Sequence, residues 1–520
     1  MSVAIAVRLA LVFTVWLPGP MAPTPAAQPN AAIRGDEVCA GATLEDLRNL
    51  YRRGQYGRVV ELCASPGPRG IELPAELVVL RSQARDSKGR AAVERAEALA
   101  AEHPHTAAVR STLATVYLSL GRLDQGRAEV DAALALDADD AEAWLGRASL
   151  RLLERDGAGA LAALDRATAA DPALRGAYTA HVMALGAARV TRDPELVSEV
   201  LEARAAHLEE RGLDGEPARV EAEMLRQGSG DPLFSMITDA DPVVLPFTPC
   251  WEGSVYRCIS LQERDREYRV LLDTGNRPGW TVHAPELLEV LPNHFGGASS
   301  LTTGSVDTAM AGRILMTQQA SFGPLVIHDL PGHFFPKPRE PYFDANLSPF
   351  FVQDRVITMD HVNGQVLLRS KERFDEDLAR ARSEGRQLAR VPLYGADWGF
   401  IPIQVEGSPA WAMIETGAEI FQLTDEFVAT AGIPATPATM RFRDRDYHYH
   451  EAEVNTFVGE VPLFQGAAHV WPGRWGDTYL GMLYDAVIGP VLLEGRFILS
   501  YDPFDRMIVI ELVERTEGDG

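Results

Sequence analysis

The stretch Tyr268–Gly275 (YRVLLDTG) decides the fold of the second half of this chain. Its residues alternate and then become apolar, which predicts a strand that is buried towards its end. The strand runs directly into an acid, a threonine and a glycine. A related stretch, Trp411–Gly417 (WAMIETG), carries the corresponding acid, and the spacing is 415 − 273 = 142. One such triplet arises by chance, but the same strand and triplet in two copies predict a repeated β unit.

The ends of the two copies also correspond. Val356–Asp360 (VITMD) and Phe497–Asp502 (FILSYD) both read as buried strands, and their final acids have the same spacing as the first pair of acids. We therefore interpret the second half as an internal duplication. The first lobe is predicted over residues 243–370, a charged linker helix over 371–388 and the second lobe over 389–515.

This arrangement resembles the retropepsin-like aspartic peptidases. In that family a hydrophobic strand runs into Asp-Thr-Gly, a flap hairpin follows, and an apolar-apolar-Gly element precedes the last strand. The run Val487–Gly489 (VIG) fits this element in the second copy. The resemblance spans residues 243–512 and implies an all-β, pepsin-type domain of two barrel-like lobes, each offering one acid. It also implies flaps near residues 295–304 and 440–451.

The resemblance implies that Asp273 and Glu415 form a catalytic carboxyl pair. Peptide hydrolysis needs a water activated between two carboxyls, one ionised to take a proton and one protonated to donate one. Two carboxyls about 3 Å apart share a single proton, and the sequence leaves open which acid is the base. A threonine hydroxyl beside each acid can lock the loops together, and glycine lets backbone approach closely. The supporting loop residues are Thr274, Gly275, Thr416, Gly417, Ile488 and Gly489.

Three departures from the family pattern keep two hypotheses open. The second acid is Glu415 rather than aspartate, and its extra methylene displaces the carboxyl unless the loop compensates. In the first copy, residues 346–348 (NLS) replace the apolar-apolar-Gly element, and Asn276 follows the first triplet. One hypothesis is an aspartic endopeptidase that hydrolyses peptide bonds. The other is a catalytically inactive, protease-like protein that binds peptides without cutting them.

The first half carries a different signal, a helical repeat. From Thr43 to Gly212 the chain is rich in Ala, Leu, Glu and Arg at helical spacing, and small residues recur every 34 positions at Ala92, Gly126 and Ala160. This resembles the tetratricopeptide repeat. It predicts an all-α repeat domain over residues 39–225, with the pattern strongest over residues 107–174.

The edges of this repeat domain are less regular. A short helical pair from Thr43 to Cys63 is expected to cap its N-terminal end. The pattern weakens after Tyr178, because Pro194 falls inside what should be a second helix. A Gly- and Pro-containing linker is predicted over residues 226–242.

Helical stacks of this kind commonly bind peptides on their concave face. The sequence therefore predicts a protein partner for the repeats, in addition to a peptide or protein substrate for the β domain. A purely structural role remains open, in which the repeats act as a rigid spacer or as an adaptor in the cell envelope.

The first residues read as a secretory signal peptide over residues 1–32. Arg8 precedes a short apolar run, Leu9–Leu17, and a Pro- and Ala-rich stretch with small residues follows. The run is too short to span a bilayer, and no later segment is long and apolar enough to do so. We expect an exported protein, periplasmic or secreted, and the Ala- and Arg-rich signal favours a bacterial source.

The four cysteines form two local pairs, Cys39 with Cys63 and Cys250 with Cys258. Of the three possible connectivities, pairing between near neighbours is the simplest in an exported protein. Cys39–Cys63 would join two short helices and Cys250–Cys258 would close a hairpin. Neither pair has zinc-ligand spacing, so neither a metal nor another cofactor is predicted.

The net charge of the chain indicates which classes of partner it can bind. Lys and Arg number 49 against 73 Asp and Glu, which gives −24. Binding to the phosphates of nucleic acid needs a cationic surface. Nucleic acid is therefore excluded as the main partner.

Overall fold

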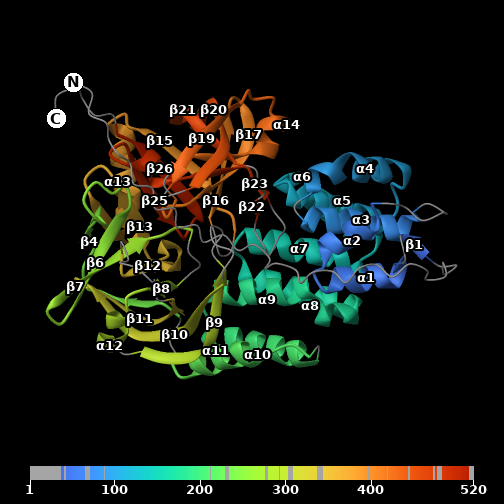
Figure 1. Ribbon diagram of the computed structural model, residues 1–520, viewed down its shortest axis with the longest axis horizontal. Coiled ribbons are helices and arrows are strands. Elements are labelled where there is room, and N and C mark those ends of the chain that lie inside the picture. The colour runs from blue at the N-terminus through green and yellow to red at the C-terminus, as the bar shows by residue number, and fades with distance from the viewer. Residues whose placement is uncertain are drawn as a thin grey trace. The chain divides into compact units, whose positions relative to one another are not determined.

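The computed structural model divides the chain into a helical unit and a β-rich unit (Figure 1). It describes residues 37–39, 42–64, 71–86, 88–210, 212–228, 233–275, 279–291, 293–302, 309–335, 343–395, 399–418, 420–442, 445–471, 475–476 and 483–513. The predicted signal peptide lies outside these residues. Apart from the short strands Glu37–Cys39 and Ala42–Thr43, the described chain up to Gly215 is helical. The large sheets, formed by strands within residues 235–471 and 486–512, lie in the β-rich unit. The predicted fold class, helical repeats followed by an all-β domain, is confirmed.

In the described part of the helical unit, four helix pairs follow the short N-terminal pair. The first helices are α3 (Leu73–Arg85), α5 (Ala107–Ser119), α7 (Ala141–Leu153) and α9 (Tyr178–Thr191). The second helices are α4 (Gly89–Glu102), α6 (Leu123–Leu136), α8 (Gly157–Ala170) and α10 (Pro194–Glu210). The first three pairs start at the predicted repeat spacing. The fourth starts later because the 3-10 turn Pro172–Gly176 is inserted before it.

Pro194 does not interrupt a helix, as the repeat register suggested. The inserted turn shifts the register, so Pro194 is the first residue of α10. A proline is tolerated there because the first N–H groups of a helix have no intrahelical partner. The fourth pair therefore continues the stack.

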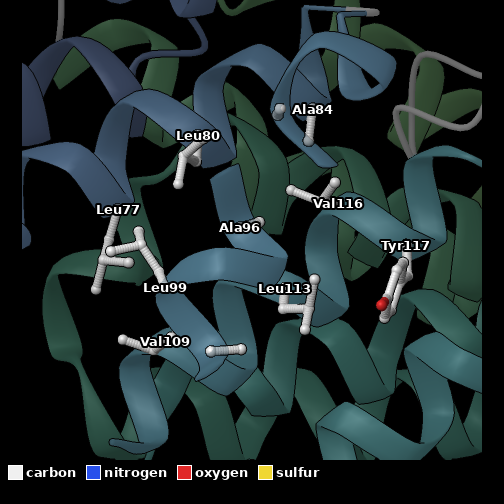
Figure 2. Close-up of a cluster of buried hydrophobic side chains, with 11 residues drawn as sticks. Leu77, Leu80, Ala84, Ala96, Leu99, Val109, Leu113, Val116 and Tyr117 are labelled. Atoms are coloured by element: carbon white, nitrogen blue, oxygen red, sulfur yellow. The ribbon is translucent and has the colours of Figure 1, made fainter. Parts of the chain in front are cut away.

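Small residues let the paired helices approach one another. Ala92 and Ala96 are buried beside Leu113 and Val116 in the core shared by α3, α4 and α5 (Figure 2). At Gly126, an added Cβ would lie 2.6 Å from a methyl carbon of Leu118. The regular recurrence of small residues thus reflects close contacts between helices.

The N-terminal helical pair contacts more helices of the array than a cap on its first pair would. It comprises α1 (Leu44–Arg52) and α2 (Tyr56–Leu62), which pack on α3. The Tyr51 hydroxyl also donates to Glu142 Oε2 on α7 at 3.3 Å, and the hydroxyls of Tyr56 and Thr179, on α9, form a hydrogen bond. The pair therefore spans from the first helix of the array to its fourth helix pair.

A disulfide fixes this N-terminal pair. Cys39 and Cys63 are bonded, as predicted, but the bond joins the strand β1 (Glu37–Cys39) to the end of α2 rather than two helices. It closes a loop with a sequence separation of 24 residues.

We expect replacement of both Cys39 and Cys63 by alanine to lower the free energy of unfolding of the helical unit by about 3 kcal/mol, because the open loop gains conformational freedom in the unfolded state. Chemical denaturation followed by helical circular dichroism measures the change. The matched control replaces Cys250 and Cys258, which lie in the β-rich unit. An unchanged helical transition would contradict the expectation.

In the β-rich unit, seven strands of a nine-stranded sheet correspond in order to the strands of a seven-stranded sheet. The first runs β6 (Arg257–Glu263), β7 (Arg266–Leu272), β12 (Ala345–Leu347), β8 (Trp280–Val282), β11 (Leu325–Phe334), β10 (Ala309–Phe322) and β9 (Asn293–Thr302). The second runs β16 (Phe400–Val405), β17 (Ser408–Ile414), β24 (Ala486–Ile488), β18 (Gln422–Thr424), β21 (Val461–Trp471), β20 (Arg445–Val458) and β19 (Thr436–Phe442). In each sheet the strand before the acid pairs in parallel with a short, distant strand.

A third sheet, which the sequence did not predict, draws three strands from each half. Its order is β15 (Gln387–Pro392), β26 (Met507–Leu512), β25 (Phe497–Asp502), β13 (Val356–Asp360), β14 (Gln365–Arg369) and β4 (Val243–Pro246). At its centre Thr358 lies opposite Ser500, and their hydroxyls are 2.8 Å apart. Thr358 and Ser500 are 142 residues apart, the same spacing as Asp273 and Glu415. The two copies of the β unit therefore meet at corresponding positions.

The segments around the predicted boundaries form regular elements of secondary structure. The N-terminal part of the helical unit extends to Gly215, and α11 (Glu216–Arg226) belongs to the β-rich unit, where it packs on β9. The segment expected to be a linker contributes β3 (Ser235–Ile237), which pairs with β11. The helix between the lobes, α13, covers Lys371–Ser383.

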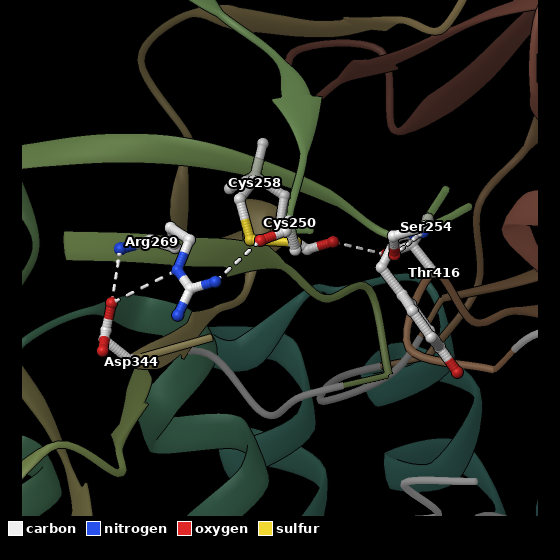
Figure 3. The surroundings of a disulfide bond; sticks show 8 residues. Cys250, Ser254, Cys258, Arg269, Asp344 and Thr416 are labelled. Atoms are coloured by element: carbon white, nitrogen blue, oxygen red, sulfur yellow. Dashed lines mark hydrogen bonds and ion pairs between the residues drawn. A yellow bond between two sulfur atoms is a disulfide. The ribbon is translucent and has the colours of Figure 1, made fainter. Parts of the chain in front are cut away.

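The second disulfide joins Cys250 to Cys258 across the paired strands β5 (Thr248–Pro249) and β6, as predicted. Arg269, on β7, donates to the Cys250 carbonyl at 3.0 Å, and its backbone N–H donates to Asp344 at 2.7 Å (Figure 3). The disulfide hairpin is therefore attached to the strand that carries Asp273.

Candidate active site

Each of the two acids lies at the end of a parallel strand pair. Asp273 follows β7, and its backbone N–H donates to the Leu347 carbonyl of β12 at 2.9 Å. Glu415 follows β17, and its N–H donates to the Ile488 carbonyl of β24 at 2.9 Å. The two acids therefore occupy corresponding positions in the two lobes.

Two buried aspartates that the sequence analysis missed brace these strands. Asp344 accepts from the N–H of Arg269 at 2.7 Å, and Asp485 accepts from the N–H of Trp411 at 3.0 Å. Each stands just before a short strand, β12 or β24, at corresponding places in the two copies. Asp344 and Asp485 are 485 − 344 = 141 residues apart, close to the spacing of Asp273 and Glu415. This spacing is the sequence signal that could have identified them.

Reciprocal hydrogen bonds join the two acid-bearing loops. The N–H groups of Thr274 and Thr416 each donate to the other residue's hydroxyl at 2.9 Å. The Thr274 hydroxyl donates to the Ile414 carbonyl at 2.7 Å, and the Thr416 hydroxyl donates to the Leu272 carbonyl at 2.6 Å. Both threonines are buried. The four bonds fix one loop against the other.

We expect Thr416→Val to lower the free energy of unfolding of the β-rich unit by about 3 kcal/mol, because the Thr274 N–H and the Leu272 carbonyl lose their buried partner. Thr416→Ser keeps the hydroxyl and is the matched control. Denaturant unfolding followed by tryptophan fluorescence measures both variants. Equal effects of valine and serine would contradict the role of the hydroxyl.

The two carboxyls are held by unequal sets of donors. The Gly275 N–H donates to Asp273 Oδ1 at 3.0 Å, and the Gly417 N–H donates to Glu415 Oε1 at 3.0 Å. Asp273 also accepts from Asn346 Nδ2, at 2.9 Å from Oδ2. Asp273 is 2% exposed, whereas Glu415 is partly exposed.

The carboxyl of Glu415 favours its protonated form. Its pKa is raised well above the ordinary value, first because the surrounding protein removes water and second because Asp273 carries like charge. The two carboxyls are also within hydrogen-bonding reach of one another. Two carboxyls in this arrangement share one proton.

Glycines make room for the carboxyls. A Cβ added at Gly275 would lie 1.5 Å from Glu415 Oε2, and one added at Gly417 would lie 2.9 Å from Asp273 Oδ1. The longer side chain of Glu415 is therefore accommodated over the Gly275 backbone. Gly489 is also constrained, because its Cβ would lie 2.5 Å from the Ala418 carbonyl oxygen.

The structure thus brings the two acids together with the predicted supporting residues of their loops, Thr274, Gly275, Thr416, Gly417, Ile488 and Gly489. Asn276 lies outside the described residues. Hairpins β9–β10 and β19–β20 occupy the predicted flap positions, but the tips at 303–308 and 443–444 are not among the described residues. Asn346, read from sequence as a departure from the pattern, is a direct partner of Asp273.

The described residues contain neither a metal-binding cluster nor a membrane-spanning helix. Among them, no group of three or more His, Cys, Asp or Glu side chains is arranged to hold a metal ion. None of the helices they form has the length and apolar character needed to cross a bilayer.

Comparison with known proteins gives one family match. Residues 85–150 match the family described as tetratricopeptide repeat, which confirms the repeat prediction for that segment. No curated protein matches the chain.

Two solved structures are similar to about half of the chain. The crystal structure of Basic 7S globulin from soybean is 14% identical, with 52% of this chain and 95% of the globulin covered and a TM-score of 0.34. The crystal structure of an aspartic proteinase from Irpex lacteus is 12% identical, with 53% and 99% covered and a TM-score of 0.35.

Proposed function

We propose that the β-rich unit is a retropepsin-like aspartic endopeptidase formed by duplication of one lobe. The observation that carries the proposal is the pairing of Asp273 with Glu415 across two loops joined by reciprocal threonine bonds. The shared order of seven corresponding strands in the two sheets supports the duplication.

In the proposed reaction, ionised Asp273 takes a proton from a water bound between the carboxyls, and the water oxygen bonds to the carbonyl carbon of the substrate. Protonated Glu415 donates its proton to the carbonyl oxygen. The C–N bond then breaks as the amide nitrogen receives the proton held by Asp273 and one of the two hydroxyls on the carbon returns its proton to Glu415. One product ends in a carboxyl group and the other in an amine, and both acids regain their starting protonation states. The raised pKa of Glu415 supports its assignment as the acid.

The test incubates the mature protein with a mixed peptide library between pH 3 and 7. We expect cleavage that is lost as pH rises through the raised pKa of Glu415, because the acid is then deprotonated. Activity should therefore extend above the pH at which an ordinary glutamate, with a pKa of about 4.3, ionises. Absence of cleavage at every pH, by the wild type and by Glu415→Asp, would overturn the proposal.

The second candidate is a binding protein without peptidase activity. The observations that favour it are the longer second acid and the polar Asn346 at the carboxyl pair. Binding of library peptides without cleavage, with weaker binding by an Asp273→Asn variant, would support this function instead.

We also propose that the helical repeats bind a protein partner and that the protein is exported, with residues 1–32 removed. The tetratricopeptide match supports the first statement, and the two disulfides support the second. Loss of partner capture on deletion of residues 36–215 tests the first. The N-terminal sequence of the protein recovered from the envelope tests the second.

A further inference from the structure

Asn346 occupies a position that differs between the two copies. It lies on β12 opposite Leu271, and the corresponding residue on β24, opposite Met413, is Val487. Asn346 is 4% exposed and lies two strand positions after the brace Asp344. A polar side chain thus replaces an apolar one beside one acid of the pair only.

The contact of this side chain is with the acid itself. Asn346 Nδ2 donates to Asp273 Oδ2 at 2.9 Å, while Asp273 Oδ1 accepts from the Gly275 N–H. An ionised carboxylate only accepts hydrogen bonds, so donors on both oxygens favour the ionised form. The donor that the structure gives to Glu415 from its own loop is the Gly417 N–H.

The charged surroundings do not account for this asymmetry. Glu415 is the titratable group that faces Asp273 from the second lobe, and its charge would disfavour ionisation of Asp273. Arg269, in the middle of β7, and Asp344, just before β12, contact one another, so their opposite charges offset each other. The neutral Asn346 amide is therefore the group that distinguishes the two acids.

We propose that Asn346 is a positioning residue that holds Asp273 as the ionised member of the pair and so determines that Asp273, not Glu415, is the general base. This role rests on the proposed peptidase function for its catalytic meaning, but the ionisation of Asp273 can be measured without substrate. In the first copy, Asn346 stands where the second copy has Val487, and this difference makes the two otherwise similar acids differ in ionisation. The unpartnered Asn346 Oδ1 is compatible with this orientation of the amide, because only the amide nitrogen can donate to a carboxylate.

The test measures the titration of Asp273 in protein labelled with ¹³C at aspartate Cγ, with Asp273→Asn to assign the signal. In Asn346→Val, which installs the residue of the second copy, we expect the titration midpoint of Asp273 to rise by about one pH unit. Asn346→Ala, which is smaller and fits the same space, should give the same shift. Ser348→Ala is the matched control, because the neighbouring Ser348 hydroxyl is buried without a hydrogen-bond partner.

The pH profile of peptide cleavage gives the second measurement. Its acidic limb should move up by about one unit in Asn346→Val and Asn346→Ala, and stay unchanged in Ser348→Ala. An unchanged Asp273 midpoint in both Asn346 variants would overturn the inference. A shifted midpoint in a protein that cleaves no peptide would uphold the role of Asn346 in ionisation and reject the peptidase function.

Discussion

Asp273→Asn is expected to reduce peptide cleavage about a thousandfold or more, because the amide cannot take the proton of the attacking water. Its folded structure should survive, since an asparagine oxygen can still accept from the Gly275 N–H. Initial rates at the pH optimum of the wild type measure the loss. Retention of more than a tenth of the activity would contradict the assignment of Asp273.

The same substitution should stabilise the protein at neutral pH. Since the pKa of Glu415 is raised in the folded state, the folded protein binds more protons than the unfolded one between the ordinary and the raised value. Stability therefore falls as pH rises through that window. Removing the like charge of Asp273 lowers the pKa of Glu415 towards its ordinary value and weakens this fall. Thermal unfolding at pH 4 and 7 measures the difference, with Asp265→Asn, in the exposed turn before β7, as the matched control.

Gly275→Ala is expected to lower cleavage on the order of a hundredfold and to destabilise the β-rich unit by about 2–3 kcal/mol, because the added methyl group overpacks the site. The new Cβ would lie 1.5 Å from Glu415 Oε2, so the carboxyl or the loop must move. Displacements of about 1 Å in a catalytic group cost on the order of a hundredfold in rate, and overpacking costs about 1–3 kcal/mol. Rate and denaturant unfolding are measured on the same preparation.

Combining Gly275→Ala with Glu415→Asp tests whether the new methyl group collides with the Glu415 side chain. Glu415→Asp shortens the side chain that collides with the new methyl group, so it should restore part of the stability lost in Gly275→Ala. The two substitutions should therefore be non-additive. Gly417→Ala, whose Cβ would approach Asp273 Oδ1 to 2.9 Å, is expected to have a smaller effect. Additive losses in the double variant would show that Glu415 does not lie over Gly275.

Much of the site could be predicted from the sequence because it is local and repeated. The strand, acid, threonine and glycine are contiguous, and the repeat spacing links Thr274 to Thr416, which the structure joins by reciprocal bonds. The sequence could not indicate which acid is the base. In our proposal this depends on the contact between the Asn346 side chain and Asp273, and the pairing of β7 with β12 brings these two residues together.

The sheet shared by the two halves also could not be predicted from the sequence. Val356–Asp360 and Phe497–Asp502 read as buried strands, but nothing local says that Thr358 pairs with Ser500. Strand partners distant in the chain are chosen by the packing of the whole domain rather than by propensity. The helical array was easier to predict, because helices α3 to α10 pack mainly on neighbouring helices of the repeat.

The N-terminal pair α1–α2 has a consequence for binding measurements on the repeats. Tyr51 and Tyr56 already contact α7 and α9, and the segment that carries them is part of the same chain. A tethered segment acts at an effective concentration in the millimolar range. A peptide that uses the same surface must compete with it, so its apparent affinity reports how readily residues 37–64 leave as well as how well the peptide fits.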